Sequence, residues 1–146
     1  MKKVIIGADH GGYKLKEDVK KFLSKNDYKF EDMGSSYDAD DDYVDYAEKV
    51  ARKVVSGNAL GVLFCRSAAG MVIAANKIRG ARAVAAFDVK SAVHSREHND
   101  ANILALSGDW LPAKKAIGIL KAWLSAEFSG EERHKRRVEK IKRLEV

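Results

Sequence analysis

The feature that most constrains this chain is a regular alternation between short apolar runs and longer amphipathic stretches. The apolar runs lie at about 4–8, 60–65, 81–86 and 101–106, and a short alternating run lies at 28–30. Continuous apolar runs of this length are typical of strands buried on both faces. The intervening stretches repeat apolar residues at helical spacing, which indicates helices with one buried side. The sequence therefore predicts five strands that alternate with helices.

This alternation favours an α/β fold of three layers, an α/β/α sandwich around a five-stranded parallel, Rossmann-like sheet. The expected helices cover residues 13–24, 43–56, 68–77 and 88–98 and a stretch that begins near Pro112. Asp88 is a candidate helix cap. A last amphipathic stretch, from Arg133 to Leu144, adds a C-terminal helix beyond the sandwich. With no linker or repeat in sight, residues 1–146 are expected to form a single domain.

Composition excludes several classes of protein. The single cysteine rules out an intrachain disulfide framework, and it does not form a zinc-site spacing with the four histidines. No apolar run approaches the roughly 20 residues of a membrane span. The run Val4–Ile6 is too short for a signal peptide. The expectation is a cytoplasmic protein that binds no membrane.

Charge points to an anionic ligand. The net charge of +6 is uneven, because residues 1–60 hold 11 Lys and Arg against 12 Asp and Glu, whereas residues 61–146 hold 16 against 9. Such an imbalance suits an anionic partner. A nucleic-acid binder usually shows a denser basic stripe with interleaved aromatic residues, and the 8% of aromatic residues here are scattered. No nucleic-acid partner is therefore predicted.

In a parallel sheet, ligands bind at the carboxyl ends of the strands, so the residues after each strand matter most. Asp9 and His10 follow the first strand and precede two glycines. The glycines allow close backbone approach, and the helix that begins there attracts an anion. The plainer interpretation is a capping Asp and a solvent-facing His.

Cys65 ends the third strand and faces the start of the next helix. Backbone N–H groups at such a place form an oxyanion nest and lower the pKa of a thiol. Ser67 can donate to the same anion. Free cysteines are also commonly buried as small apolar residues, and that alternative stays open.

His98 and Asn99 precede the fifth strand and fit either a helix C-terminus or a general acid with a polar neighbour. Because His98 enters that strand and Asp9 leaves the first, we expect both to face one cleft. Arg133 and Arg137 are four residues apart and share one face of a helix. They fit a phosphate clamp or simply a solvated surface. The aspartates at 38–42 are expected to form a solvated loop.

These blocks, in this order and along nearly the whole chain, resemble type B ribose-5-phosphate isomerases, a family that includes the galactose-6-phosphate isomerase subunits. The resemblance rests on the segments 7–12 (GADHGG), 42–47 (DYVDYA), Cys65, 73–77 (IAANK), 80–83 (GARA), 95–102 (SREHNDAN) and 133–134 (RH). It implies a metal-independent aldose–ketose isomerase without a cofactor. The implied substrate is ribose 5-phosphate, which places the protein in the pentose phosphate pathway.

The resemblance also implies catalytic roles. Cys65 is the base that moves a proton between C2 and C1 of the sugar. Ser67 and the backbone after Cys65 hold the enediolate oxygen, and Asp9 and His98 assist ring opening. The substrate-binding loop then comprises Arg66, Ala68, Ala69 and Gly70.

The remaining implied residues bind the substrate. Tyr43 and Asn99 contact the sugar, and His10, Arg133 and Arg137 bind its phosphate. Family members are homodimers or homotetramers whose site lies between subunits. Residues 130–146 are accordingly expected to form an arm that reaches a neighbouring subunit, and the helix there has apolar residues that need cover.

The chain departs from the family pattern near the implied site. The family usually has Cys-Gly-Thr-Gly-aliphatic-Gly, whereas this chain has Arg66, Ser67 and Ala68 after the cysteine. Asp109 stands where an Arg that helps to bind phosphate is common. Arg66 either pairs with Asp109 and restores ordinary substrate use, or shifts the preference to another sugar. The alternatives are therefore an isomerase of a different sugar or hexose phosphate, a non-catalytic sugar-phosphate-binding protein, or a nucleic-acid binder that uses the basic C-terminal segment.

Overall fold

The computed structural model describes residues 1–34 and 36–145 and confirms the α/β prediction. Five parallel strands form one sheet with the order β2-β1-β3-β5-β4. The expected bounds hold to within a few residues, and Ser35 and, in the predicted arm, Val146 lie outside the described residues. The strands are β1 (Lys3–Ala8), β2 (Phe30–Asp32), β3 (Ala59–Cys65), β4 (Ala83–Ala85) and β5 (Ile103–Ser107).

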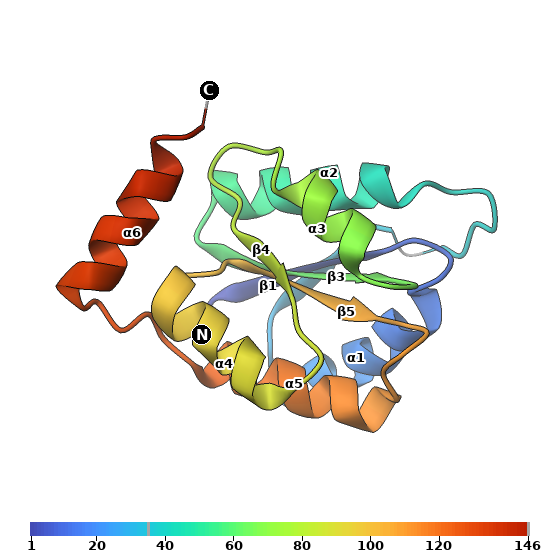
Figure 1. The fold of residues 1–146 in the computed structure, drawn as a ribbon. Helices are drawn as coiled ribbons and strands as arrows, with labels where there is room; N and C mark the ends of the chain where they lie inside the picture. The colour runs from blue at the N-terminus through green and yellow to red at the C-terminus, as the bar shows by residue number, and fades with distance from the viewer. Residues whose placement is uncertain (35, 146) are drawn as a thin grey trace.

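Helices cover both faces of the sheet, as Figure 1 shows. The bounds are α1 (Tyr13–Lys25), α2 (Tyr43–Ser56), α3 (Ala69–Ala75), α4 (Val89–Asn99), α5 (Ala113–Ser125) and α6 (Glu132–Lys142). Helices α2 and α3 pack on one face, and α1, α4 and α5 pack on the other. Helix α6 lies outside these layers and packs against α4. The predicted sandwich with an additional C-terminal helix is therefore confirmed.

Two apolar clusters, one on each side of the sheet, hold the layers together. The cluster on the α1 and α5 side includes Phe64, Leu104 and Trp123, and the other includes Ile5, Val50 and Met71. All six side chains are fully buried. Buried apolar surface contributes roughly 25 cal/mol per Å² to folding, so the two clusters supply the main driving force for this arrangement.

The outer side of β4 is occupied by a side chain from α3's C-terminal end. Asn76 accepts a hydrogen bond from the Ala83 N–H through Oδ1 at 2.7 Å, and its Nδ2 donates to the Ala83 carbonyl at 2.9 Å. Asp88 accepts a hydrogen bond from the Ser91 N–H at 2.7 Å, which confirms it as the cap of α4. Among the described residues, no helix combines the length and the apolar character that crossing a membrane requires.

Candidate active site

The carboxyl ends of the central strands bring two of the predicted catalytic residues to one edge. Ala8 pairs with Phe64, and Cys65 pairs with Ser107, so β1, β3 and β5 end level with one another. Asp9 follows β1 directly, and its side chain, like that of Cys65, is buried. The prediction that residues after these strands share one edge of the sheet is therefore confirmed.

Cys65 has the predicted position but not the predicted acidity. Its Sγ accepts a hydrogen bond from the Ala68 N–H at 3.1 Å, as expected for a thiol that faces a helix start. Burial nevertheless raises the pKa of the Cys65 thiol, and the Asp9 carboxylate adds to the rise. The backbone N–H groups of the loop only partly oppose these two effects. The prediction of a lowered thiol pKa is thus wrong for this chain, because desolvation outweighs the nest.

Asp9 has a raised pKa as well, again chiefly because it is buried. Its Oδ1 accepts a hydrogen bond from the Gly12 N–H at 3.1 Å, which favours the ionised form but does not offset the burial. A Cβ added at Gly12 would lie 2.2 Å from the carbonyl of Phe64. Glycine is therefore required where this turn crosses β3, and it holds Asp9 beside the thiol.

The loop after Cys65 contains an alanine in a backbone conformation that favours glycine. Ala68 is fully buried and has a φ of 71° in the left-handed region, which costs an L residue roughly 1–2 kcal/mol. Ser67 Oγ accepts a hydrogen bond from the Ala69 N–H at 3.3 Å. A Cβ added at Gly70 would lie 2.6 Å from the ring of Tyr43, so the glycine lets that ring pack on the loop. The structure therefore brings Tyr43 to the Cys65 loop.

His10 is held by a residue that the sequence did not single out. One Asp41 oxygen, Oδ1, lies 3.0 Å from the His10 backbone N and 2.9 Å from its ring Nδ1. Asp9, His10 and Asp41 each offer a ligand atom, and these atoms lie within 4.8 Å of one another. Because N–H donors already occupy Asp9 and Asp41, the cluster fits a hydrogen-bonded network better than a metal site.

Arg66 pairs with Asp109, which is the contact that one of the two predicted outcomes requires. Arg66 Nη1 lies 3.5 Å from Asp109 Oδ2, and both side chains are largely exposed. The stem of Arg66 lies over Gly11, where an added Cβ would be 2.4 Å from Cγ. The guanidinium therefore offsets the carboxylate that replaces the family's usual arginine.

His98 lies at the other end of the sheet from Asp9 and Cys65. Helix α4 runs back after β4 and ends at Asn99, just before β5 begins, so both residues sit at the amino end of the strands. The prediction that His98 and Asp9 face one cleft is wrong within a single chain, because the crossover returns α4 to the opposite edge. The ring of His98 instead stacks on the ring of His134, with centroids 4.2 Å apart. The centroid of the His94 ring lies 4.0 Å from that of His98.

The predicted phosphate clamp lies at this same amino end. Arg133 and Arg137 are exposed on α6, and Arg133 Nε pairs with Glu131 Oε2 at 3.0 Å. His134 is buried between α6 and α4, and its Nδ1 lies 2.6 Å from Ser129 Oγ. Burial and the neighbouring His98 lower the pKa of His134. The stacked rings therefore hold the arginine-bearing helix next to His98.

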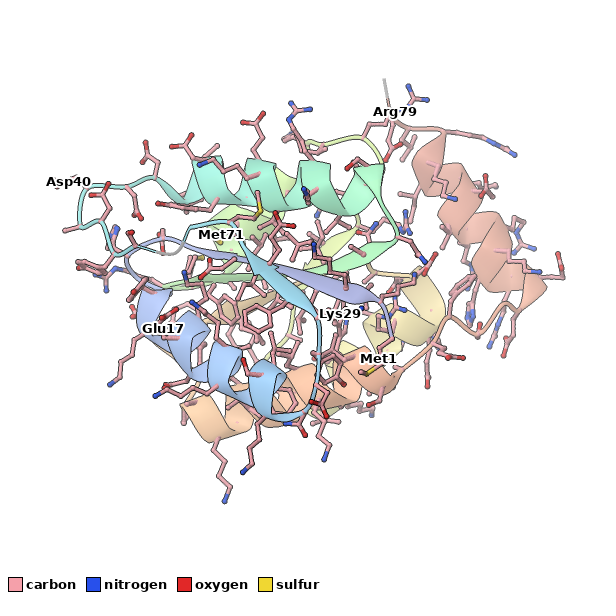
Figure 2. The ribbon with its side chains drawn as sticks, turned by 180° about the vertical axis from the view of Figure 1, so that it is seen from behind. Met1, Glu17, Lys29, Asp40, Met71 and Arg79 are labelled. Carbon is pink, nitrogen blue, oxygen red and sulfur yellow. The ribbon has the colours of Figure 1, made fainter. Side chains whose placement is uncertain are left out.

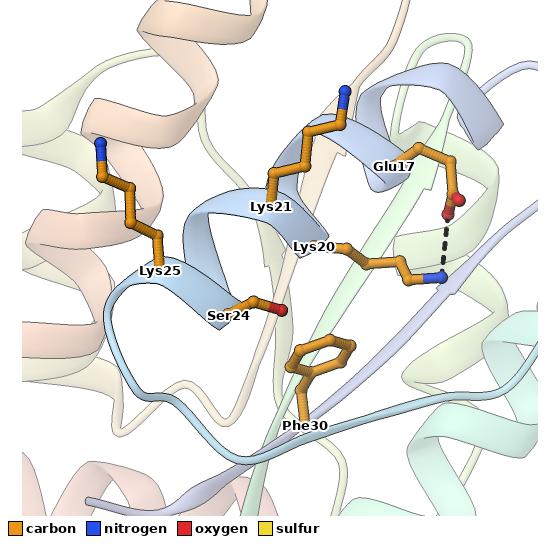
Figure 3. A pocket seen from close by; sticks show the side chains of 6 residues that line it. All are labelled: Glu17, Lys20, Lys21, Ser24, Lys25 and Phe30. Carbon is orange, nitrogen blue, oxygen red and sulfur yellow. Dashed lines mark ion pairs between the residues drawn. The ribbon is translucent and has the colours of Figure 1, made fainter.

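Two cavities lie away from the Cys65 edge. The one in Figure 3 is lined by lysines of α1 and by Phe30, and Lys20 pairs with Glu17 at 3.2 Å. A second cavity, of about 600 Å³, lies between α6 and the β4 edge and is lined in part by Asn99, Ile141 and Leu144. Neither contains a residue from the Cys65 loop.

Comparison with known proteins gives one consistent family. The family model described as Ribose/Galactose Isomerase matches residues 4–141. The ribose-5-phosphate isomerase B of Escherichia coli K12 is 39% identical over 146 residues, which covers 99% of this chain and 97% of that protein.

Solved structures agree. The ribose-5-phosphate isomerase B of Clostridium thermocellum is 44% identical and has a TM-score of 0.94, with 97% of this chain and 96% of that chain covered. The ribose-5-phosphate isomerase B of Mycoplasma genitalium, solved with bound ribulose 5-phosphate, is 36% identical with a TM-score of 0.93. That match covers 97% of this chain and 95% of the other.

Proposed function

This chain belongs to the ribose/galactose isomerase family, and from that premise we propose that it interconverts ribose 5-phosphate and ribulose 5-phosphate without a metal. The observation that carries the proposal is the buried Cys65 thiol beside Asp9 at the carboxyl edge of the sheet. A base in such a place suits abstraction of a proton next to a carbonyl, whereas binding alone requires no base.

In the proposed reaction, the Cys65 thiolate takes the proton from C2 of the open-chain aldose. The electron pair of that C–H bond moves toward the carbonyl, and the charge develops on O1 as an enediolate. Ser67 and the loop backbone stabilise this oxygen, since preorganised donors act where charge appears. The proton on sulfur then goes to C1, O1 gains a proton and O2 loses one, which gives the ketose.

The charge on Asp9 affects how readily the Cys65 thiol ionises. Because burial raises the pKa of both Asp9 and Cys65, two negative charges at this edge are unfavourable. We propose that the thiolate forms when Asp9 is protonated or has turned to the sugar hydroxyl. Ring opening needs an acid near the ring oxygen, the role that the family resemblance gives to His98.

His98 reaches the Cys65 edge only from a second copy of the chain. We propose a homodimer in which His98, Asn99, Arg133 and Arg137 of one protomer complete the Cys65 site of the other. Exposed apolar side chains at the end of α6 and just beyond it support this assembly, since Ile141 is 44% exposed and Leu144 is 80% exposed. The adjoining cavity, lined by Asn99, offers a surface that a partner would cover.

The Arg66–Asp109 ion pair favours a phosphorylated sugar as the substrate. Without Arg66, the Asp109 carboxylate would repel a phosphate, and the pair at 3.5 Å removes much of that penalty. We also propose a cytoplasmic location, where the free thiol of Cys65 stays reduced.

The test is a panel of pentose and hexose phosphates and free sugars incubated with the purified protein in the presence of a chelator. We expect ribulose 5-phosphate to form from ribose 5-phosphate, with solvent deuterium entering the substrate carbon. The Cys65→Ala variant, checked for a native circular dichroism spectrum, should lose both signals. Failure to turn over any sugar phosphate, or near-normal turnover by Cys65→Ala, contradicts the proposal.

A further inference from the structure

Asp41 contacts both the backbone and the ring of His10. It sits in the loop between β2 and α2, 31 residues from His10 in sequence, and its side chain is only 8% exposed. Its Oδ1 accepts a hydrogen bond from the His10 backbone N–H at 3.0 Å and lies 2.9 Å from the ring Nδ1. The two contacts fix both the backbone and the ring orientation of His10.

The protonation state of the pair follows from the charges around it. Burial opposes ionisation of Asp41, but hydrogen bonds from His10 and Tyr46 outweigh it and lower the pKa of the Asp41 carboxyl. An ionised carboxylate only accepts hydrogen bonds, so Nδ1 must carry the proton. In the neutral ring, Nε2 then has the free lone pair.

We propose that Asp41 is a positioning residue for phosphate binding: one oxygen of its carboxylate holds both the backbone N–H and the ring Nδ1 of His10. This rests on the proposed function, in which His10 contacts the substrate phosphate. Because Asp41 occupies Nδ1, Nε2 is the ring nitrogen left to contact the phosphate.

Other charged and polar groups also lie around His10. Asp9 comes from the same turn, Asp41 from the acidic loop and Tyr46 from α2, where it hydrogen bonds to Asp41. Arg66 packs over the adjacent Gly11. Among these groups, Asp41 is the one that contacts the ring itself, so the loss of its carboxylate should affect His10 most.

The decisive variant is Asp41→Asn, since the amide oxygen can still accept from His10 while the charge is lost. We expect KM for ribose 5-phosphate, and Ki for inorganic phosphate as a competing ligand, to rise about tenfold, with kcat largely kept. Asp41→Ala should weaken binding further. Asp40→Asn is the matched control, because Asp40 is exposed at the outer end of the same loop (Figure 2).

A second measurement does not depend on activity. The nitrogen NMR shifts of His10 in the ligand-free protein should report a proton on Nδ1 in the wild type, in Asp41→Asn and in Asp40→Asn. Asp41→Ala should lose this preference. If the wild-type ring carries its proton on Nε2, or if KM and Ki are unchanged in Asp41→Asn while the wild type isomerises ribose 5-phosphate, the inference is wrong and the proposed function stands. If no sugar phosphate is turned over, the proposed function fails, and the NMR shifts and phosphate affinity still decide the role of Asp41.

Discussion

Lys16 should be worth several kcal/mol to the fold, because its ammonium group is fully buried and is paired with a carboxylate there. Its Nζ lies 3.0 and 2.9 Å from the two oxygens of Asp32 and donates to the Gly34 carbonyl. Lys20 also reaches Asp32, at 3.1 Å. Gly34 begins the loop that carries Asp41, so this cluster anchors one end of the proposed phosphate-binding apparatus.

The magnitude follows from what each substitution leaves behind. Lys16→Met keeps the apolar stem and removes the ammonium, while Asp32 retains Lys20 and the Gly34 N–H at 3.0 Å. We expect a loss of about 2–3 kcal/mol in the free energy of unfolding. Asp32→Asn leaves a buried ammonium whose next carboxylate, Glu17, is 3.9 Å away, so about 3–5 kcal/mol is expected.

Urea unfolding followed by circular dichroism, at one fixed protein concentration, measures both losses. The double variant Lys16→Met/Asp32→Asn should lose clearly less than the two single variants added together, because each removes the same pair. Lys3→Met is the control: Lys3 pairs with Glu31 at 3.0 Å on the surface, and its loss should stay below about 1 kcal/mol. Strict additivity in the double variant would refute the reasoning.

The same pair predicts a pH dependence. Burial opposes ionisation of Asp32, but the hydrogen bonds from Lys16, Gly34 and Lys20 outweigh it and lower the pKa of that carboxyl. A lowered carboxyl pKa stabilises the fold above the unfolded value of about 4, and the contribution is lost as the pH falls through the folded value. The difference in stability between the wild type and Lys16→Met should therefore shrink in acid. A constant difference down to the acid transition contradicts this assignment.

Three further outcomes are expected. Asp9→Asn removes a negative charge that raises the pKa of Cys65, so the pH midpoint of thiol alkylation by iodoacetamide should fall; an unchanged midpoint would show that burial alone sets the acidity. Removal of residues 130–146 should weaken the proposed dimer in sedimentation experiments and nearly abolish isomerisation, and a truncated protein that stays dimeric and fully active argues against the proposed shared site. Arg66→Gly should raise KM for ribose 5-phosphate, and adding Asp109→Arg should reverse the rise, unless the pair at 3.5 Å has no part in binding.

The sequence predicted the architecture well because its signals were local. Continuous apolar runs marked the buried strands, and Asp88 marked a helix start that the structure confirms. The position of Cys65 at a strand end followed from the same pattern. The pKa of the Cys65 thiol did not follow from that pattern, since burial and the proximity of Asp9 depend on how distant segments pack.

The site was predicted less completely, for two physical reasons. Placing His98 and Asp9 in one cleft neglected the direction of α4, which carries His98 to the amino end of the sheet. Asp41 was counted among the solvated aspartates because nothing in their spacing separates it from Asp40. Its pairing with His10 is a contact across 31 residues that only the folded chain reveals.

The hydrogen bonds from Asn76 to Ala83 limit how copies of this chain can assemble. An exposed sheet edge can recruit a strand from another molecule and start an open-ended polymer. Here the Asn76 side-chain amide hydrogen bonds to both the N–H and the carbonyl of Ala83, and the opposite edge strand, β2, is short, with three residues. Association by strand addition is thus disfavoured at both ends of the sheet. Copies are left to meet through helices and loops, the kind of contact that closes into a finite, symmetric particle instead of a fibre.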